Sequence, residues 1–98
     1  MIVRIWHGRV TLEKHAEYLE LMQRVALPDY RAVKGNRDAR CLYRREGDIV
    51  HFLMVTTWDD MRAIQAFAGE DAGRAKYYDF DDDFLMEKEP VVQHYDVA

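Results

Sequence analysis

The chain has 98 residues, enough for one hydrophobic core and too few for two, so residues 1–98 are predicted to form a single domain. Its formal net charge of −4 argues against binding to nucleic acid or to an anionic membrane surface. The one cysteine, Cys41, excludes an internal disulfide and a cysteine-built metal site. The sequence has no signal-peptide pattern and no apolar run of roughly 18 residues, so it predicts a cytoplasmic protein without membrane contact.

The first predicted element is a β-strand over residues 2–10, where apolar and polar side chains alternate and β-branched residues are frequent. Ile5 and His7 fall on one face of this strand, and Arg4 and Trp6 fall on the other. Side chains alternate along a strand, so the two pairs point to opposite sides of the sheet.

A helix is predicted next, from a cap at Thr11 to about Leu27, because apolar residues recur there at helical spacing. Pro28 is expected to interrupt or bend this helix, with residues 29–33 adding one more turn. Residues 34–36, Lys-Gly-Asn, then mark a clear break.

Two strands are predicted over residues 37–46 and 49–58, joined by a short turn. The charged side chains of the first suit an edge strand. The second is apolar on both faces, so it needs cover on both sides. A second helix follows, capped by Asp59 or Asp60 and ending near Gly69.

The C-terminal third is predicted to hold a helical turn over residues 70–76, an aromatic and acidic loop over 77–84, and a strand over 89–97. The acidic loop lacks the glycine and the alternate ligand spacing of a calcium loop, so no metal site is predicted. The order β-α-β-β-α-β predicts an α+β, ferredoxin-like fold, in which a four-stranded antiparallel sheet carries both helices on one face.

The other sheet face is predicted to be the contact surface of a homodimer. The strand over residues 49–58 has apolar side chains on both faces, and both helices lie on one side of it. An uncovered apolar face of this size is unusual on a monomer. A second copy of the chain, packed sheet against sheet, would bury it.

Four stretches carry a resemblance to a known family: R-I-W-H-G-R (4–9), K-G-N (34–36), T-T-W-D-D-M-R-A-I-Q-A-F-A-G (56–69) and Y-Y-D-F-D-D-D-F-L (77–85). Over essentially its whole length the chain resembles the dimeric α/β-barrel superfamily, and most closely small proteins labelled antibiotic biosynthesis monooxygenase-like. The resemblance implies a barrel built by two subunits. The superfamily includes cofactor-independent oxygenases, heme-degrading monooxygenases, muconolactone isomerase-like enzymes and stress-responsive proteins.

The heme-degrading branch of this superfamily has an asparagine near the end of the first strand and a tryptophan–histidine pair on and just beyond the second helix. The positions of that pair are held here by Phe67 and Tyr77, and the asparagine position by His7 or Gly8. None of the three matches. The resemblance therefore predicts a chain that uses no cofactor and disfavours heme, although a tyrosinate at Tyr77 could ligate heme iron.

The resemblance to the cofactor-independent oxygenases implies a base that deprotonates an electron-rich aromatic or polyketide-type substrate in a water-poor pocket. His7 and Tyr77 are the predicted catalytic residues, in a pocket between the sheet and the second helix. The other predicted ligand-binding residues are aromatic or cationic: Arg4, Trp6, His51, Trp58, Phe67, Tyr78 and His94.

Several of these residues also have a purely structural interpretation. Buried tryptophans such as Trp6 and Trp58 usually only pack, and a histidine within an apolar strand, as His51 is, is usually a hydrogen-bonded core residue. His7 and His94 lie on strands that are neighbours in this fold, so the two could lie close together, either as part of a site or as a polar pair that lines a wet sheet face.

Arg4 shares a strand face with Trp6 and would be an unpaired buried charge unless it meets an anion. Asp96 or the carboxylate or phenolate of a ligand could serve. The alternative to an enzyme is a non-catalytic, ligand-binding or stress-responsive dimer of the same fold.

Overall fold

The computed structural model describes all residues, 1–98. Its elements, in chain order, are β1 (Ile2–Thr11), the 3₁₀ turn η1 (Leu12–Lys14), α1 (His15–Leu21), the π-helical turn η2 (Met22–Ala26), α2 (Leu27–Arg31), β2 (Asn36–Glu46), β3 (Ile49–Trp58), α3 (Met61–Ala68), α4 (Asp81–Phe84) and β4 (Gln93–Asp96). The strands form one antiparallel sheet in the order β2-β3-β1-β4. The predicted ferredoxin-like fold is confirmed.

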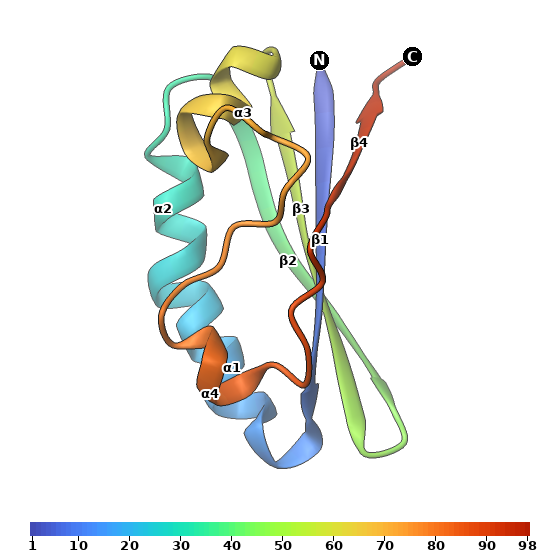
Figure 1. The fold of residues 1–98 in the computed structure, drawn as a ribbon. Coiled ribbons are helices and arrows are strands. Elements are labelled where there is room, and N and C mark those ends of the chain that lie inside the picture. The colour runs from blue at the N-terminus through green and yellow to red at the C-terminus, as the bar shows by residue number, and fades with distance from the viewer.

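The first helical run continues without a break from η1 to the end of α2 (Figure 1), so Pro28 does not interrupt it. The backbone N–H of Leu27 donates to the carbonyl of Met22, five residues earlier, which widens the turn just before the proline. Proline has no N–H and its ring crowds the carbonyl four residues before it. A widened turn at this point relieves that conflict and keeps the run helical.

The second helix, α3, is short and sharply bounded. The side chain of Asp60 caps it, because Oδ1 accepts a hydrogen bond from the backbone N–H of Ala63 at 3.0 Å. Gly69 ends it with φ = +96°, a backbone conformation that favours glycine. The helical turn predicted over residues 70–76 is absent, and the chain runs on as an extended segment with one turn.

The last strand is also shorter than predicted, because the residues before it have other partners. Val92 donates its N–H to the carbonyl of Gly73 at 2.9 Å, and Ala75 donates its N–H to the carbonyl of Pro90 at 3.0 Å. Residues 90–92 therefore pair with the segment after α3, and only Gln93–Asp96 joins β1.

All helices and the segment over residues 69–80 lie on one side of the sheet, as Figure 1 shows. The core lies between these elements and the alternate side chains of β1 and β3, including Val10, Phe52, Met54 and Trp58. No element of the chain covers the other face, which we call the open face. None of the helices combines the length and the apolar character that crossing a membrane demands.

Candidate functional site

The sheet separates the nine predicted site residues into two groups. Those on the helix side are Arg4, Trp6, Trp58, Phe67, Tyr77, Tyr78 and His94, and those on the open face are His7 and His51. The prediction that His7 and His94 lie close together is wrong. His94 lies directly opposite Arg4 in the β1–β4 register and so shares the helix-side face with it.

Arg4 is the buried charge of the helix-side group, with only 1% of its surface exposed. Its Nη2 donates to the backbone carbonyl of Arg74 at 3.1 Å, whereas Nε and Nη1 have no partner. The predicted counterion, Asp96, is exposed and lies opposite Ile2, so it does not neutralise Arg4. Burial lowers the pKa of the Arg4 guanidinium, and the nearby Tyr30 hydroxyl opposes this shift.

Aromatic rings surround this guanidinium. The ring of Phe67 lies 5.6 Å from the Arg4 Cζ atom and stacks on Tyr30, with 4.3 Å between ring centroids and 24° between planes. A second cation, Lys76, places its Nζ atom 4.1 Å from the centroid of Phe67. The Nε1 atom of Trp6 is buried without a hydrogen-bond partner. The helix-side layer thus contains hydrogen-bond donors and π-faces but no anion next to Arg4.

The hydroxyls of the tyrosine pair are already engaged. Tyr77 donates its O–H to the backbone carbonyl of Glu89 at 2.5 Å, and Tyr78 donates to Oδ2 of Asp29 at 2.6 Å. Burial, the largest effect, raises the pKa of both phenols. At neutral pH they hold their protons and act as donors, so Tyr77 is not poised as a base in this arrangement.

Trp58 and His94 differ in how far their polar atoms are satisfied. Trp58 is fully buried and its Nε1 donates to Oγ1 of Thr56 at 2.8 Å, so it is a packing residue. His94 is partly buried and its Nε2 has no partner. Burial and then the nearby Arg4 charge lower the pKa of His94, which keeps it neutral.

The helix-side layer has little free space, since its hollow, lined by Trp6, Tyr30 and Tyr78 among others, has a volume of about 10 Å³. This is room for about one water. Asp81 links two parts of this layer, since its carboxylate accepts hydrogen bonds from the O–H of Tyr18 and from the backbone N–H of Tyr78, each at 2.7 Å. The acidic loop therefore supplies a buried acceptor that anchors the chain, and no three ligating side chains in the structure gather as a metal site would require.

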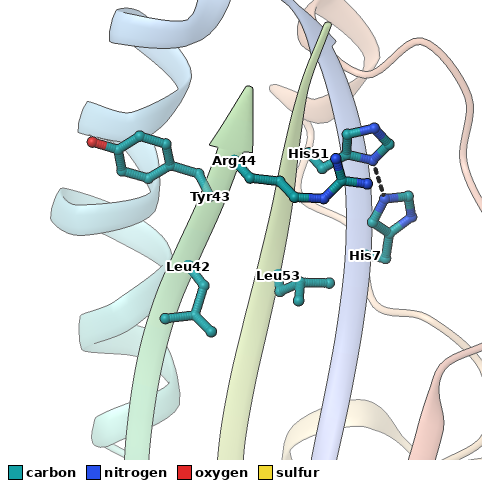
Figure 2. A pocket seen from close by; sticks show the side chains of 6 residues that line it. All are labelled: His7, Leu42, Tyr43, Arg44, His51 and Leu53. Atoms are coloured by element: carbon teal, nitrogen blue, oxygen red, sulfur yellow. Dashed lines mark hydrogen bonds between the residues drawn. The ribbon is translucent and has the colours of Figure 1, made fainter. Parts of the chain in front are cut away.

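The open face holds a chain of four side chains, which we call the Glu–His–His–Glu chain. His7 Nδ1 contacts the carboxylate of Glu89, His7 Nε2 lies 2.9 Å from His51 Nδ1, and His51 Nε2 lies 3.2 Å from Glu46 Oε1. Figure 2 shows the two rings end to end beside Arg44. They border a hollow of about 410 Å³ with an apolar floor that includes Leu53.

Sequence reasoning missed the residues that hold these groups in place: Tyr30, Arg44, Glu46, Lys76, Asp81 and Glu89. A signal existed for Lys76, which directly precedes the tyrosine pair. No signal in the sequence pointed to Glu89, because its partner His7 lies 82 residues away along the chain.

No family model matches this chain, and no curated protein matches it. Among solved structures, the chain is similar to a variant of MhuD crystallised with two manganese protoporphyrin IX molecules bound per active site. The TM-score is 0.61 and the identity 17%, and the match covers 99% of this chain and 94% of that one. This likeness supports the ferredoxin-like fold.

The comparison corrects the prediction that a chain of this kind uses no cofactor and disfavours heme, since the similar structure holds metalloporphyrin in its active site. The helix-side layer of the present chain, with its hollow of about 10 Å³, does not fit a porphyrin in the arrangement seen here. No chemical step is therefore derived through that group.

Proposed function

We propose that the chain forms a homodimer through its open sheet face, and that each subunit binds an aromatic small molecule with an anionic group in the helix-side layer. We further propose that the bound ring is oxygenated in a monooxygenase-type reaction. The buried and only partly bonded guanidinium of Arg4 is the observation that carries the binding proposal.

An unpaired buried charge is costly, so a protein that keeps one needs a use for it. The Nε and Nη1 atoms of Arg4 have no partner, and the N–H groups on each can donate a hydrogen bond to an oxygen of an anionic ligand. The rings of Phe67 and Trp6 offer apolar surface for the rest of such a ligand. MhuD, which takes a porphyrin, shows that this fold accommodates large planar aromatic molecules.

A ligand reaches Arg4 only if the segment over residues 69–80 moves. Tyr78 and Lys76 tie that segment to Asp29, at 2.6 and 3.4 Å, and Arg74 ties it to Arg4. Besides these side-chain contacts, only two backbone bonds tie the segment to a distant part of the chain, those that join residues 73 and 75 to residues 92 and 90. It therefore has fewer bonds than the strand ladders and can separate more easily than they do.

The oxygenase part of the proposal is supported by the resemblance to antibiotic biosynthesis monooxygenases. For an anthrone substrate the reaction balances without further reagents: the ring CH₂ becomes C=O with one atom of O₂, and the other atom leaves as water with the two hydrogens. The test is oxygen uptake over a panel of anthrones and hydroquinones, with and without added manganese protoporphyrin. Turnover that is lost in Arg4→Met but kept in Arg24→Met, an exposed arginine, supports the proposal.

The absence of turnover over the whole panel would favour a second candidate, a non-catalytic binding dimer. The engaged hydroxyl of Tyr77 and the small interior favour this candidate. It predicts that Tyr77→Phe and His7→Ala change stability and no rate.

The homodimer proposal is supported by the composition of the open face. Ile5, Leu53 and Val55 lie there partly exposed, Leu42 is 48% exposed and Tyr95 is 55% exposed. A second copy packed against this face would bury them, as hydrophobic burial favours. Sedimentation of a single chain at micromolar concentration would contradict this part of the proposal.

A further inference from the structure

The Glu–His–His–Glu chain uses every ring nitrogen of its two histidines. The ring centroids of His7 and His51 lie 5.2 Å apart and their planes differ by 25°. With 2.9 Å between the facing nitrogens, the rest of the centroid separation is one ring radius on each side. The rings therefore lie end to end and nearly coplanar, which aims one nitrogen directly at the other.

This geometry fixes the number of protons. Ionised carboxylates only accept, so His7 Nδ1 and His51 Nε2 must each carry a proton toward Glu89 and Glu46. The inner nitrogens also need a proton between them, because two facing lone pairs at 2.9 Å would repel. With both carboxylates ionised, the complete chain of hydrogen bonds therefore needs three ring protons, one more than two neutral imidazoles carry.

The third proton balances the local charge. Two carboxylates contribute −2, the shared proton +1 and Arg44, whose Nη1 lies 3.3 Å from Glu46 Oε2, a further +1. The hydrogen bond from His51, and after it that from Arg44, lowers the pKa of Glu46 and keeps it ionised. The adjacent charged groups on this face, Arg9 and Glu87, form their own ion pair at 2.8 Å.

We propose that the proton shared by His7 and His51 controls self-association of this chain through its open face. This inference rests on the proposed homodimer and adds its regulation. With the proton in place the Glu–His–His–Glu chain and Arg44 are together neutral, so a second copy can cover them without burying a net charge.

The loss of one proton and the gain of one proton both weaken the dimer in which a second copy covers the open face. Loss of the shared proton leaves a net charge of −1 and deprives one carboxylate of its donor. Gain of another proton turns both inner nitrogens into donors that face each other. In the single chain, water can solvate the freed groups, since the side chains of His7 and Glu89 are 30% and 38% exposed. In a dimer, water cannot reach these groups, so association is strongest at intermediate pH.

Sedimentation equilibrium between pH 5 and 9 tests the proposal, with the wild type, a His7→Gln/His51→Gln double variant and a His15→Gln control. Glutamine keeps polar groups at both sites but does not titrate in this range. His15 lies on the helix side of the sheet, against Tyr43 and Phe52. We expect wild-type and control dimers to weaken roughly tenfold or more at both ends of the range, and the double variant to change less than about threefold.

The same pH dependence in the wild type and the double variant would overturn the proposal and leave the homodimer intact. A wild-type chain that stays single at every pH would overturn both. If the double variant does not fold, ¹⁵N spectra of the wild-type histidines decide: three ring protons shared by His7 and His51 at neutral pH support the proposal, and two contradict it.

Discussion

Replacement of Arg4 by methionine should make the protein more stable and at the same time abolish its preference for anionic ligands. Methionine keeps the apolar stem of arginine but removes the charge and the two nitrogen atoms, Nε and Nη1, whose N–H groups lack partners. A gain in stability on removal of a functional group is the expected signature of a residue that is kept for binding.

The magnitude follows from the contacts of the guanidinium. Its surface is 1% exposed, and each unsatisfied buried donor costs about 1–3 kcal/mol, a cost that methionine removes. Against this stands the bond from Nη2 to the carbonyl of Arg74, and a bond from a charged donor contributes about 1.5–3 kcal/mol. The balance is centred on a net stabilisation of roughly 2 kcal/mol, in the range found when buried charges give way to apolar side chains.

Urea unfolding of the wild type and the variant at the same protein concentration measures the difference, because the stability of any chain that self-associates depends on its concentration. Arg24→Met, at an arginine whose side chain is 68% exposed, should change the free energy of unfolding by less than about 0.5 kcal/mol. A loss of 2 kcal/mol or more in Arg4→Met would contradict this prediction, since it would mean that the folded chain already compensates the charge of Arg4.

Three further predictions concern the buried polar groups. Asp81→Ala should destabilise the fold by about 2–4 kcal/mol in urea unfolding, because the O–H of Tyr18 and the N–H of Tyr78 lose their acceptor. Stability measured by thermal unfolding should fall between about pH 9 and pH 12. Burial raises the pKa of Tyr30 from 10.0 to about 12 and that of Cys41 from 9.0 to about 11. The unfolded chain therefore releases these protons at lower pH than the folded chain does, and rising pH favours unfolding. For the same reason the Cys41 thiol should react with a disulfide reagent at pH 8 far more slowly in the folded chain than in urea.

Each of these predictions has a clear contrary result. Asp82→Ala is the control for Asp81→Ala, since Asp82 is exposed and pairs only with Lys88 at the surface, and equal effects of the two would contradict the role of the buried carboxylate. Stability that is flat to pH 12 would show that Tyr30 is not confined as described. Labelling of Cys41 at the same rate in the native and the unfolded chain would show that burial does not raise the pKa of its thiol.

Most of the fold could be predicted from local pattern. Alternation in residues 2–10 predicted that Arg4 and Trp6 lie on one face of the strand and His7 on the other, and the structure has them on these two faces. The doubly apolar strand over residues 49–58 lies in the interior of the sheet, between β1 and β2. These features depend on the two-residue period of a strand, which is visible in a single sequence.

The errors arose where distant residues decide local structure. The segment after Gly69 was predicted to be helical, but residues 73–75 bond instead to residues 90–92. This exchange also shortens the last strand, and the register of that strand puts His94 opposite Arg4 rather than near His7.

The candidate sites were less predictable than the fold. The burial of Arg4 could be inferred from its place on an apolar strand face. The Glu–His–His–Glu chain could not, because it joins β1 and β3 with residues 46 and 89 through side-chain contacts between distant positions.

The most direct test of the proposed function is calorimetric titration of the wild type and Arg4→Met with a matched pair of ligands, anthracene-2-carboxylate and its methyl ester. A carboxylate bonded to Arg4 predicts that the wild type binds the acid at least roughly tenfold more tightly than the ester, and that the variant binds both alike. Equal binding of acid and ester by the wild type would contradict the account.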